Sequence, residues 1–311
     1  MLKLIECVPN FSEGRDKNKI NDILSSMNES ANITVLDVDM GFDTNRTVIT
    51  IVGSPNDILE AAYNGIKRAS EIIDMRKHVG THPRIGSTDV CPLIPISNVS
   101  EEECIKLSIK LGRRLGENLK LPVYLYEKSA KNSDRIKLPN IRKGEYEGLK
   151  KKLKDKNWIP DFGPSKINVL AGATIVGCRD FLIAYNINLN TRDQRLATDI
   201  AFELREVGRS KRIPNKKSNN LLDGEIVRDQ NGKAIKVPGK FKDVKGIGWY
   251  VSEFNRAQIS INFNNYKIST IHHVFDEACK LANERGLRVT GSELVGLIPL
   301  DALLMAGEYY L

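Results

Sequence analysis

The chain has 311 residues, a length that suggests about two domains, each large enough to enclose its own core. Hydrophobic residues make up 41% of the sequence and charged residues 28%, which is ordinary for a globular protein. No apolar run approaches the ~20 residues that a membrane span requires, so we expect no membrane contact. The five cysteines are scattered without a C-x-x-C motif, and no cleavage site follows the first residues. Both features favour reduced thiols in a cytoplasmic protein.

The net charge is +8, and the basic residues gather in two runs, residues 150–156 and 205–217. Neither run is interleaved with aromatic side chains in the manner of a base-stacking surface, so we interpret both as solvated basic faces and expect no nucleic acid partner. The positive field would also attract a small anionic ligand. A basic nucleic-acid-binding module is the alternative from a different class, and it predicts binding that weakens steeply with salt.

In the first part of the chain, hydrophobic spacing predicts alternating strands and helices. In the strand of residues 33–39, the period of two places Asp37 and Asp39 on one face. Ser54 and Ser100 supply caps for two helices, and Ser100 begins a capping box. The predicted strands are residues 3–8, 33–39, 46–52 and 123–126, and the predicted helices are residues 20–27, 54–73, 100–115 and a basic one near 143–156.

The second part of the chain has the same alternation. A capping box at Thr191 and Gln194 begins one helix, and Gly286 ends another. Residues 208–242 form a basic, Asn-rich insert with a turn signal at 229–232, which we interpret as a surface hairpin. The predicted strands are residues 167–175, 181–189, 244–251, 258–263 and 287–290, and the predicted helices begin at residues 191, 271 and 299.

This order of elements predicts an α/β (α+β) fold. We expect two α/β sandwich subdomains with mixed β-sheets, each covered by helices on one face. The boundary is placed near Asp180, which gives an N-terminal subdomain of residues 1–179 and a C-terminal subdomain of residues 180–311. The sequence contains no G-x-G-x-x-G motif and no phosphate-binding loop of the P-loop type.

Two polar loops, residues 37–46 and 77–86, are where we expect chemistry. In the second loop, glycines and Pro83 prevent a continuous helix. His78 and His82 stand four residues apart, but the broken helix and the lack of further ligands argue against a metal site. The residues alone leave two interpretations of His82 open. It either satisfies backbone carbonyls, or it has a carboxylate of the first loop beside it and exchanges protons near neutral pH.

Several short motifs follow one another along nearly the whole chain. In the first part they are residues 7–15 (CVPNFSEGR), 37–39 (DVD), 44–48 (TNRTV) and 78–86 (HVGTHPRIG). They continue with residues 162–164 (FGP), 172–174 (GAT), 181–189 (FLIAYNINL), 248–251 (GWYV) and 291–296 (GSELVG). Together these motifs closely resemble those of glutamate formiminotransferases. So many segments in order make the resemblance specific.

The resemblance implies transfer of the formimino group of N-formimino-L-glutamate to N5 of tetrahydrofolate, in the degradation of histidine to glutamate. Tetrahydrofolate or its polyglutamates is then the co-substrate, and no metal is required. The family architecture implies two α/β subdomains with a folate tunnel between them, in a homodimer. Because the sequence stops at Leu311, we expect the single-function form without a cyclodeaminase domain. Formyl transfer from 5-formyltetrahydrofolate to glutamate stays open as an alternative, whereas the presence of His82 and Asp39 argues against a folate binder without catalysis.

The position that matches the family's catalytic histidine is His82, and the position that matches its acidic partner is Asp39. One imidazole can take a proton from N5 and then protonate the departing glutamate nitrogen. A carboxylate beside the cationic amidinium carbon stabilises it, either directly or by orienting His82. Asp43 follows a variable position and is given no role.

The remaining implied site residues bind the two substrates. Guanidinium groups pair with carboxylates in a bidentate manner, so Arg46 and Arg84 are expected to hold the donor, together with Asn45 and His78. The stretch that matches the family's folate-binding segment is Gly163, Pro164, Ser165, Lys166, Ile167, Asn168, Val169, Leu170, Ala171 and Gly172.

Overall fold

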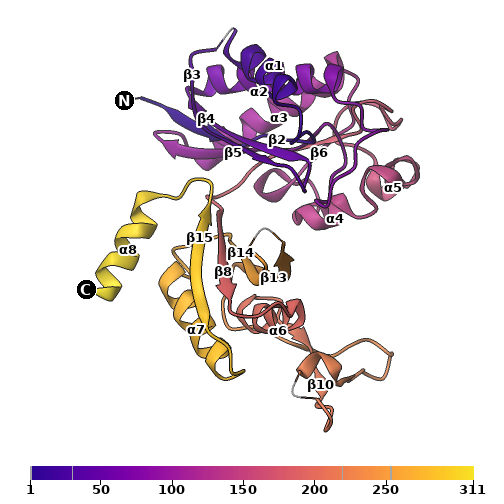
Figure 1. The fold of residues 1–311 in the computed structure, drawn as a ribbon. Helices are drawn as coiled ribbons and strands as arrows, with labels where there is room; N and C mark the ends of the chain where they lie inside the picture. Colours follow the sequence, from indigo (N-terminus) through magenta and orange to yellow (C-terminus); the bar gives the residue numbers. More distant parts are fainter. Residues whose placement is uncertain (1, 30, 219, 253) are drawn as a thin grey trace. The chain divides into compact units, whose positions relative to one another are not determined.

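The computed structural model of the protein describes residues 2–29, 31–218, 220–252 and 254–311. The chain divides into two compact units, the first ending at Arg179 and the second beginning at Asp180 (Figure 1). Each unit has a sheet and a hydrophobic core of its own, as expected for two α/β subdomains. In the described part of the chain, no helix combines the length and apolar character needed to cross a bilayer.

The first unit is built on a seven-stranded mixed sheet. Strands β1 (Leu4–Cys7) and β2 (Asn10–Phe11) are separated by Val8 and Pro9, and both pair with β4 (Arg46–Gly53) on one side and β5 (Thr88–Ser97) on the other. Strand β3 (Ile33–Gly41) pairs with β4. Beyond β5, strands β7 (Thr174–Cys178) and β6 (Val123–Leu125) extend the sheet in parallel. The prediction of a mixed sheet is confirmed for this unit.

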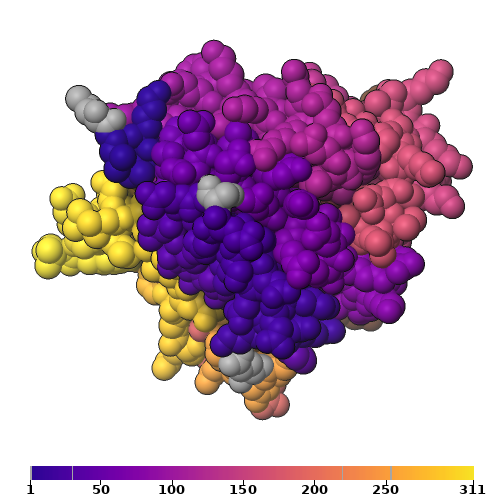
Figure 2. Space-filling view, turned by 90° about the horizontal axis from the view of Figure 1, so that it is seen from above, coloured from indigo at the N-terminus to yellow at the C-terminus, as the bar shows by residue number. Residues whose placement is uncertain are grey.

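Helices cover one face of this sheet: α1 (Lys17–Asn28), α2 (Pro55–Ile72) and α3 (Glu101–Asn118) pack on it through apolar stripes. Figure 2 looks onto the outer side of this helical layer, which fills most of the view in indigo to magenta. Ser54 caps α2 and Ser100 forms the predicted capping box of α3. On the other face, α4 (Leu138–Arg142) and α5 (Glu145–Lys152) enclose a smaller core with Val90 and Tyr124 (Figure 1).

The register of β3 decides which side chains lie on the face away from α1 to α3. The pairing shifts between Val35 and Asp37, so Asp37 lies opposite Thr50 and Asp39 opposite Val48. Asp37 and Asp39 therefore share one face, as the period of two predicts. Arg46, two residues before Val48 in β4, lies on the same face. The first polar loop therefore lies on the sheet face that points away from α1 to α3.

The second unit contains a four-stranded sheet in the order β13 (Val244–Val251), β14 (Arg256–Phe263), β8 (Ile183–Leu189), β15 (Val289–Val295). All its pairings are antiparallel, so the prediction of a mixed sheet is wrong for this unit. Helices α6 (Gln194–Leu204) and α7 (Ile271–Asn283) form the core with this sheet. At Gly248 the α6 backbone comes so close that a Cβ would lie 2.1 Å from the Thr198 nitrogen. The final helix is α8 (Leu300–Tyr310).

Several predicted elements differ in detail. The apolar run 167–175 is a strand only from Thr174, because the residues before it form a loop. The cap of α6 is Asp193, whose carboxylate accepts from the Arg195 amide, and not Thr191. The insert contains the short pairs β9 (Arg209–Ser210) with β12 (Lys236–Val237) and β10 (Arg212–Ile213) with β11 (Glu225–Ile226). The 3-10 turns are η1 (Glu127–Ser129), η2 (Ser133–Arg135), η3 (Lys156–Trp158) and η4 (Leu221–Asp223).

Candidate active site

Residues 85–87, at the end of the predicted catalytic loop, are hydrogen-bonded to residues 171–173, at the end of the predicted folate-binding stretch. The Ala173 amide donates to the Ile85 carbonyl at 3.0 Å, and the Ser87 amide donates to the Ala171 carbonyl at 2.8 Å. Gly172 has a φ of +72°, and a Cβ there would lie 2.2 Å from the Ile85 oxygen. Only glycine permits both the conformation and the close approach. The tertiary structure therefore brings the predicted catalytic loop and the predicted folate loop together.

Helix α5 holds both loops through Tyr146. The Tyr146 amide donates to the Arg84 carbonyl at 2.9 Å, and its hydroxyl donates to the Val169 carbonyl at 2.6 Å. Within the folate loop, Asn168 Oδ1 accepts from the amides of Leu170 and Ala171 at 3.1 and 3.0 Å. This turn leaves the side chains of Val169 and Leu170 exposed. The expectation of a strand here is wrong because these backbone groups bond locally and to the neighbouring loop.

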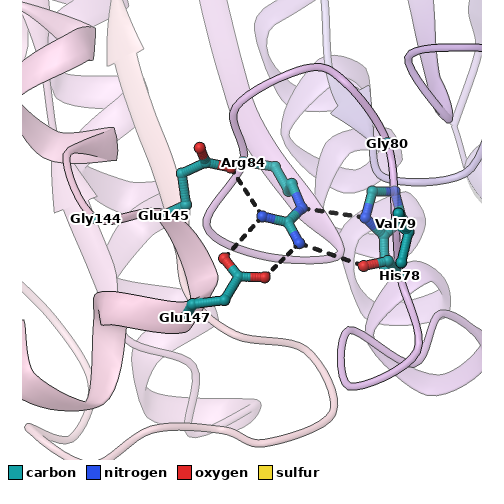
Figure 3. Close-up of a pocket in the computed structure, with 7 residues that line it drawn as sticks. All are labelled: His78, Val79, Gly80, Arg84, Gly144, Glu145 and Glu147. Atoms are coloured by element: carbon teal, nitrogen blue, oxygen red, sulfur yellow. Dashed lines mark hydrogen bonds and ion pairs between the residues drawn. The ribbon is translucent and has the colours of Figure 1, made fainter.

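The guanidinium of Arg84 forms hydrogen bonds and ion pairs with other residues of the first unit (Figure 3). Its Nη1 donates to Glu145 at 2.8 Å and Glu147 at 2.9 Å, and its Nη2 donates to Glu147 at 2.7 Å and the His78 carbonyl at 3.3 Å. Its Nε donates to His78 Nδ1 at 3.1 Å. All five N–H groups of the guanidinium therefore have acceptors within the protein. In this arrangement the guanidinium of Arg84 has no N–H left for a substrate carboxylate, and its expected role in substrate binding stays a prediction.

The side chains of His78 and Asn45 also form hydrogen bonds within the protein. His78 accepts from Arg84 at Nδ1 and therefore donates from Nε2 to the Asn45 carbonyl at 2.8 Å. The Asn45 side chain accepts from the Gly14 amide at 2.9 Å and donates to the Val79 carbonyl at 3.0 Å. Both residues join the first polar loop to the second, and their expected role in substrate binding stays a prediction. A cavity of about 410 Å³ lies beside them, lined by His78, Val79, Gly80, Arg84, Gly144, Glu145 and Glu147 (Figure 3).

His82 is held differently. Its Nδ1 contacts both an acceptor, the Pro83 carbonyl at 2.7 Å, and a donor, Arg46 Nη1, and the shorter contact favours a proton on Nδ1. Arg46 Nη1 approaches the same nitrogen at 3.2 Å. Burial and the nearby charges of Arg46 and Arg142 lower the pKa of His82 to about 3. His82 is therefore neutral at physiological pH, and its Nε2, which bonds to no described residue, has a free lone pair.

The carboxylate nearest to this arrangement is Asp89. Its Oδ2 accepts from Arg46 Nη1 at 2.9 Å and from Arg142 Nη2 at 2.5 Å, and its Oδ1 accepts from the Ile85 amide at 3.1 Å. Arg46 Nη2 also donates to Asn10. Burial by itself raises the pKa of Asp89, but Arg142 and Arg46 together hold it below its usual value. Two guanidinium groups share one carboxylate, which leaves a net positive charge beside His82.

Asp39 bonds to no described residue through its side chain. Burial, and the neighbouring Asp37, raise its pKa above the usual value. The described residues that shift the pKa of His82 are Arg46, Arg142, Asp89 and Pro83, and Asp39 is not among them. Sequence reasoning missed Asp89 and Arg142. Asp89 lies just beyond the polar loop, and Arg142 closes a stretch that gave only a general polar signal.

Comparison with known protein families gives two matches. A model of the formiminotransferase domain, N-terminal subdomain, matches residues 4–179, and a model of the formiminotransferase domain matches residues 184–311. The chain belongs to the formiminotransferase family. Its division into two units follows the two subdomains of that family. Among the described residues, no group of three or more His, Cys, Asp or Glu side chains is arranged to hold a metal ion.

Three relatives illustrate the range of formiminotransferases that the chain resembles. It is 39% identical to a glutamate formimidoyltransferase from Thermoplasma acidophilum and 37% identical to one from Streptococcus pyogenes. Both alignments cover 100% of this chain, and they cover 93% and 94% of those two proteins. A formimidoyltransferase-cyclodeaminase from Dictyostelium discoideum is 48% identical over 100% of this chain and 53% of that protein. The chain thus spans about half the length of this bifunctional relative.

Proposed function

We propose that the protein is a glutamate formimidoyltransferase, which moves the formimino group of N-formimino-L-glutamate to N5 of tetrahydrofolate. The observation that carries the proposal is His82. It is neutral, its Nε2 bonds to no described residue, and the end of its loop is hydrogen-bonded to residues 171–173. This is the protonation state that a general base requires at neutral pH. The names of the two full-length relatives support the same activity.

In the proposed mechanism, N5 attacks the formimino carbon and forms a tetrahedral intermediate. His82 Nε2 takes the proton that N5 must lose and gives a proton to the glutamate nitrogen as the carbon–nitrogen bond breaks. Glutamate leaves as an amine, and the formimino group stays on N5. Burial and the charges of Arg46 and Arg142 disfavour the imidazolium in the ligand-free protein, so His82 becomes an effective base only when the carboxylates of a bound substrate offset those charges.

Asp39 is proposed as the carboxylate that meets the amidinium group of the donor. Its side chain makes no bond to described residues, and a cation placed beside it would lower its raised pKa and favour the carboxylate. Arg46 remains the candidate for a substrate carboxylate, because its Nε has no partner among the described residues. The folate loop fits tetrahydrofolate through its exposed Val169 and Leu170 and the net positive charge of the neighbouring arginine pair.

The proposed setting follows the family: a cytoplasmic homodimer in histidine degradation that uses tetrahydrofolate or its polyglutamates and binds no nucleic acid. Light scattering of the purified chain tests the dimer. Binding of random-sequence RNA that falls steeply with salt would contradict the exclusion of nucleic acid.

The function is tested by mixing the protein with tetrahydrofolate and N-formimino-L-glutamate and measuring acid-converted 5,10-methenyltetrahydrofolate by absorbance. A parallel reaction contains 5-formyltetrahydrofolate and glutamate. Turnover in the first mixture is expected, and turnover in the second alone would make formyl transfer the main activity. His82→Ala should abolish turnover and leave folate affinity within about tenfold, because the imidazole acts mainly in the transition state. Unchanged kcat in this variant would remove His82 from the mechanism.

A further inference from the structure

A β-bulge in β5 turns Asp89 to the same face as its neighbour Val90. The register of β2 against β5 shifts between the two residues of β2, so that Asp89 has no partner residue there. Val90 packs in the core that contains Ile141 of α4. Asp89 contacts the next residue of α4, Arg142. In a regular strand two consecutive side chains point to opposite faces, so the bulge aims an additional side chain, the Asp89 carboxylate, at α4.

Asp89 and two arginines form a connected chain of polar groups that ends at His82. Arg142 Nη2 and Arg46 Nη1 both donate to Asp89 Oδ2, at 2.5 and 2.9 Å. Arg46 Nη1 also lies 3.2 Å from His82 Nδ1. Two positive groups thus share one negative group beside the imidazole. One positive charge is therefore left without a counter-charge among these residues.

The guanidinium of Arg142 has N–H donors without partners. A guanidinium carries five N–H groups, and the contact with Asp89 uses only Nη2. The Nε of Arg142 is buried without a partner. Its Nη1 bonds to no described residue, and the side chain is 13% exposed. Arg142 can therefore donate to a further carboxylate, in the charge-assisted manner that guanidinium groups favour.

A small ligand with two carboxylates fits this arrangement. We propose that Arg142 binds the γ-carboxylate of N-formimino-L-glutamate, and that this carboxylate supplies the counter-charge that lets His82 accept a proton. Arg46 contacts His82 directly, so it meets the carboxylate nearer the reacting nitrogen. Arg142 is joined to Arg46 only through Asp89, so it meets the farther carboxylate. The identity of the ligand rests on the proposed function, whereas the unmatched positive charge and the free donors do not.

The bound carboxylate acts on His82 through its charge. Arg46, Arg142 and Asp89 are the charged groups that act on this imidazole, from β4, α4 and β5. Burial and the two arginines lower the pKa of His82 to about 3. A further negative charge in this partly buried place favours the imidazolium, so binding of the donor raises that pKa toward the range in which a general base works. The arginine that recognises the donor's side chain thereby also activates the base.

The first experiment compares turnover with N-formimino-L-glutamate and with its γ-amide, N-formimino-L-glutamine. Arg142→Gln should raise the KM for N-formimino-L-glutamate by about 10- to 100-fold, the effect of losing a hydrogen bond between charged groups. The γ-amide should have a similarly high KM with the parent chain, and Arg142→Gln should change it by no more than about threefold, because the contact is already missing. Penalties that add in full would overturn the assignment.

Two further variants separate recognition from folding. Arg113→Gln removes an exposed arginine of α3, and it should leave both KM values within about twofold of the parent. Arg142→Lys keeps the positive charge beside Asp89 but loses the fork of donors, so this chain should fold and discriminate less between the two donors. Full discrimination in Arg142→Lys would overturn the assignment even if Arg142→Gln does not fold.

The second experiment follows the His82 ring by NMR in the presence of saturating N-acetyl-L-glutamate, an analogue that has both carboxylates and no formimino group. The ring signal is assigned with His82→Ala. The analogue should raise the pKa of His82 in the parent chain, and N-acetyl-L-glutamine should raise it less. In Arg142→Gln, N-acetyl-L-glutamate should exceed N-acetyl-L-glutamine no longer. Bound N-acetyl-L-glutamate that leaves the pKa of His82 unchanged in the parent chain would overturn the activation.

Three outcomes separate this inference from the function on which it rests. Formimino transfer with the same KM in the parent chain and in folded Arg142→Gln overturns the carboxylate site alone. Binding of N-acetyl-L-glutamate that is lost in Arg142→Gln, without any formimino transfer, overturns the proposed reaction and leaves the site. A larger loss of 5-formyltetrahydrofolate affinity than of donor KM in Arg142→Gln would assign Arg142 to the co-substrate and overturn its role toward the donor.

Discussion

The buried carboxylate Asp89 provides the sharpest test of how the first unit is held together. Asp89 is 1% exposed and accepts from Arg46, Arg142 and the Ile85 amide. The substitution Asp89→Asn keeps the size of the side chain but removes its charge. Two partly buried guanidinium groups, 12% and 13% exposed, are then left without a counter-charge.

Removing one partner of a buried ion pair costs about 3–5 kcal/mol, because the remaining charge stays desolvated. In a unit of this size, 1 kcal/mol corresponds to about 2–4 °C, so the melting temperature should fall by about 6–20 °C. The control is Asp22→Asn, whose carboxylate pairs with Arg68 at 2.9 Å but is 54% exposed. An exposed pair of this kind contributes about 1 kcal/mol or less.

The assay is thermal unfolding of both variants at pH 7 and at lower pH. The folded-state pKa of Asp89 is lowered, so its stabilisation is complete above the unfolded-state pKa of about 3.9 and is lost as the pH falls through the folded-state value. The gap between the parent chain and Asp89→Asn should therefore be constant from pH 7 to about 5 and shrink below about 4. Equal shifts for the two variants at pH 7 would refute the reasoning.

Three other predictions concern the loops. The His82 ring should show no NMR titration between pH 5 and 8, and Arg142→Gln should raise its pKa because a nearby positive charge is removed; a transition near pH 6.5 in the parent chain would contradict this. Arg84→Gln should lower stability while leaving the KM for N-formimino-L-glutamate nearly unchanged, and a selective rise in KM would return Arg84 to substrate binding. Gly172→Ala should destabilise the protein far more than Gly232→Ala, as measured by melting temperature. Both glycines have a positive φ, but only Gly172 has backbone atoms in the Cβ position, so similar losses would contradict the clash.

The sequence by itself predicted the longer helices, most of the longer strands and the family, but it missed α4 and β5. Periodicity and caps act over a few residues, so the stripe of α1 and the caps Ser54 and Ser100 appear in the structure as predicted. Local sequence patterns gave wrong predictions where contacts with distant residues determine the backbone conformation. The apolar run 167–175 reads as a strand, but bonds to the neighbouring loop and the turn at Asn168 keep its first part irregular.

Only the tertiary structure decided which groups surround His82. Arg142 and Asp89 are 53 residues apart, and Arg46 and Asp89 are 43 apart, so their pairing depends on sheet register and on where α4 packs. The sequence did not distinguish Arg46 from Arg84 as a cation for the substrate, yet Glu145 and Glu147 on α5, together with His78, accept from all donors of Arg84. Each arginine has a fixed number of N–H donors, and the fold decides which acceptors lie within reach of them. For that reason, residue types could indicate the chemistry of this loop, but not which side chains remain free to perform it.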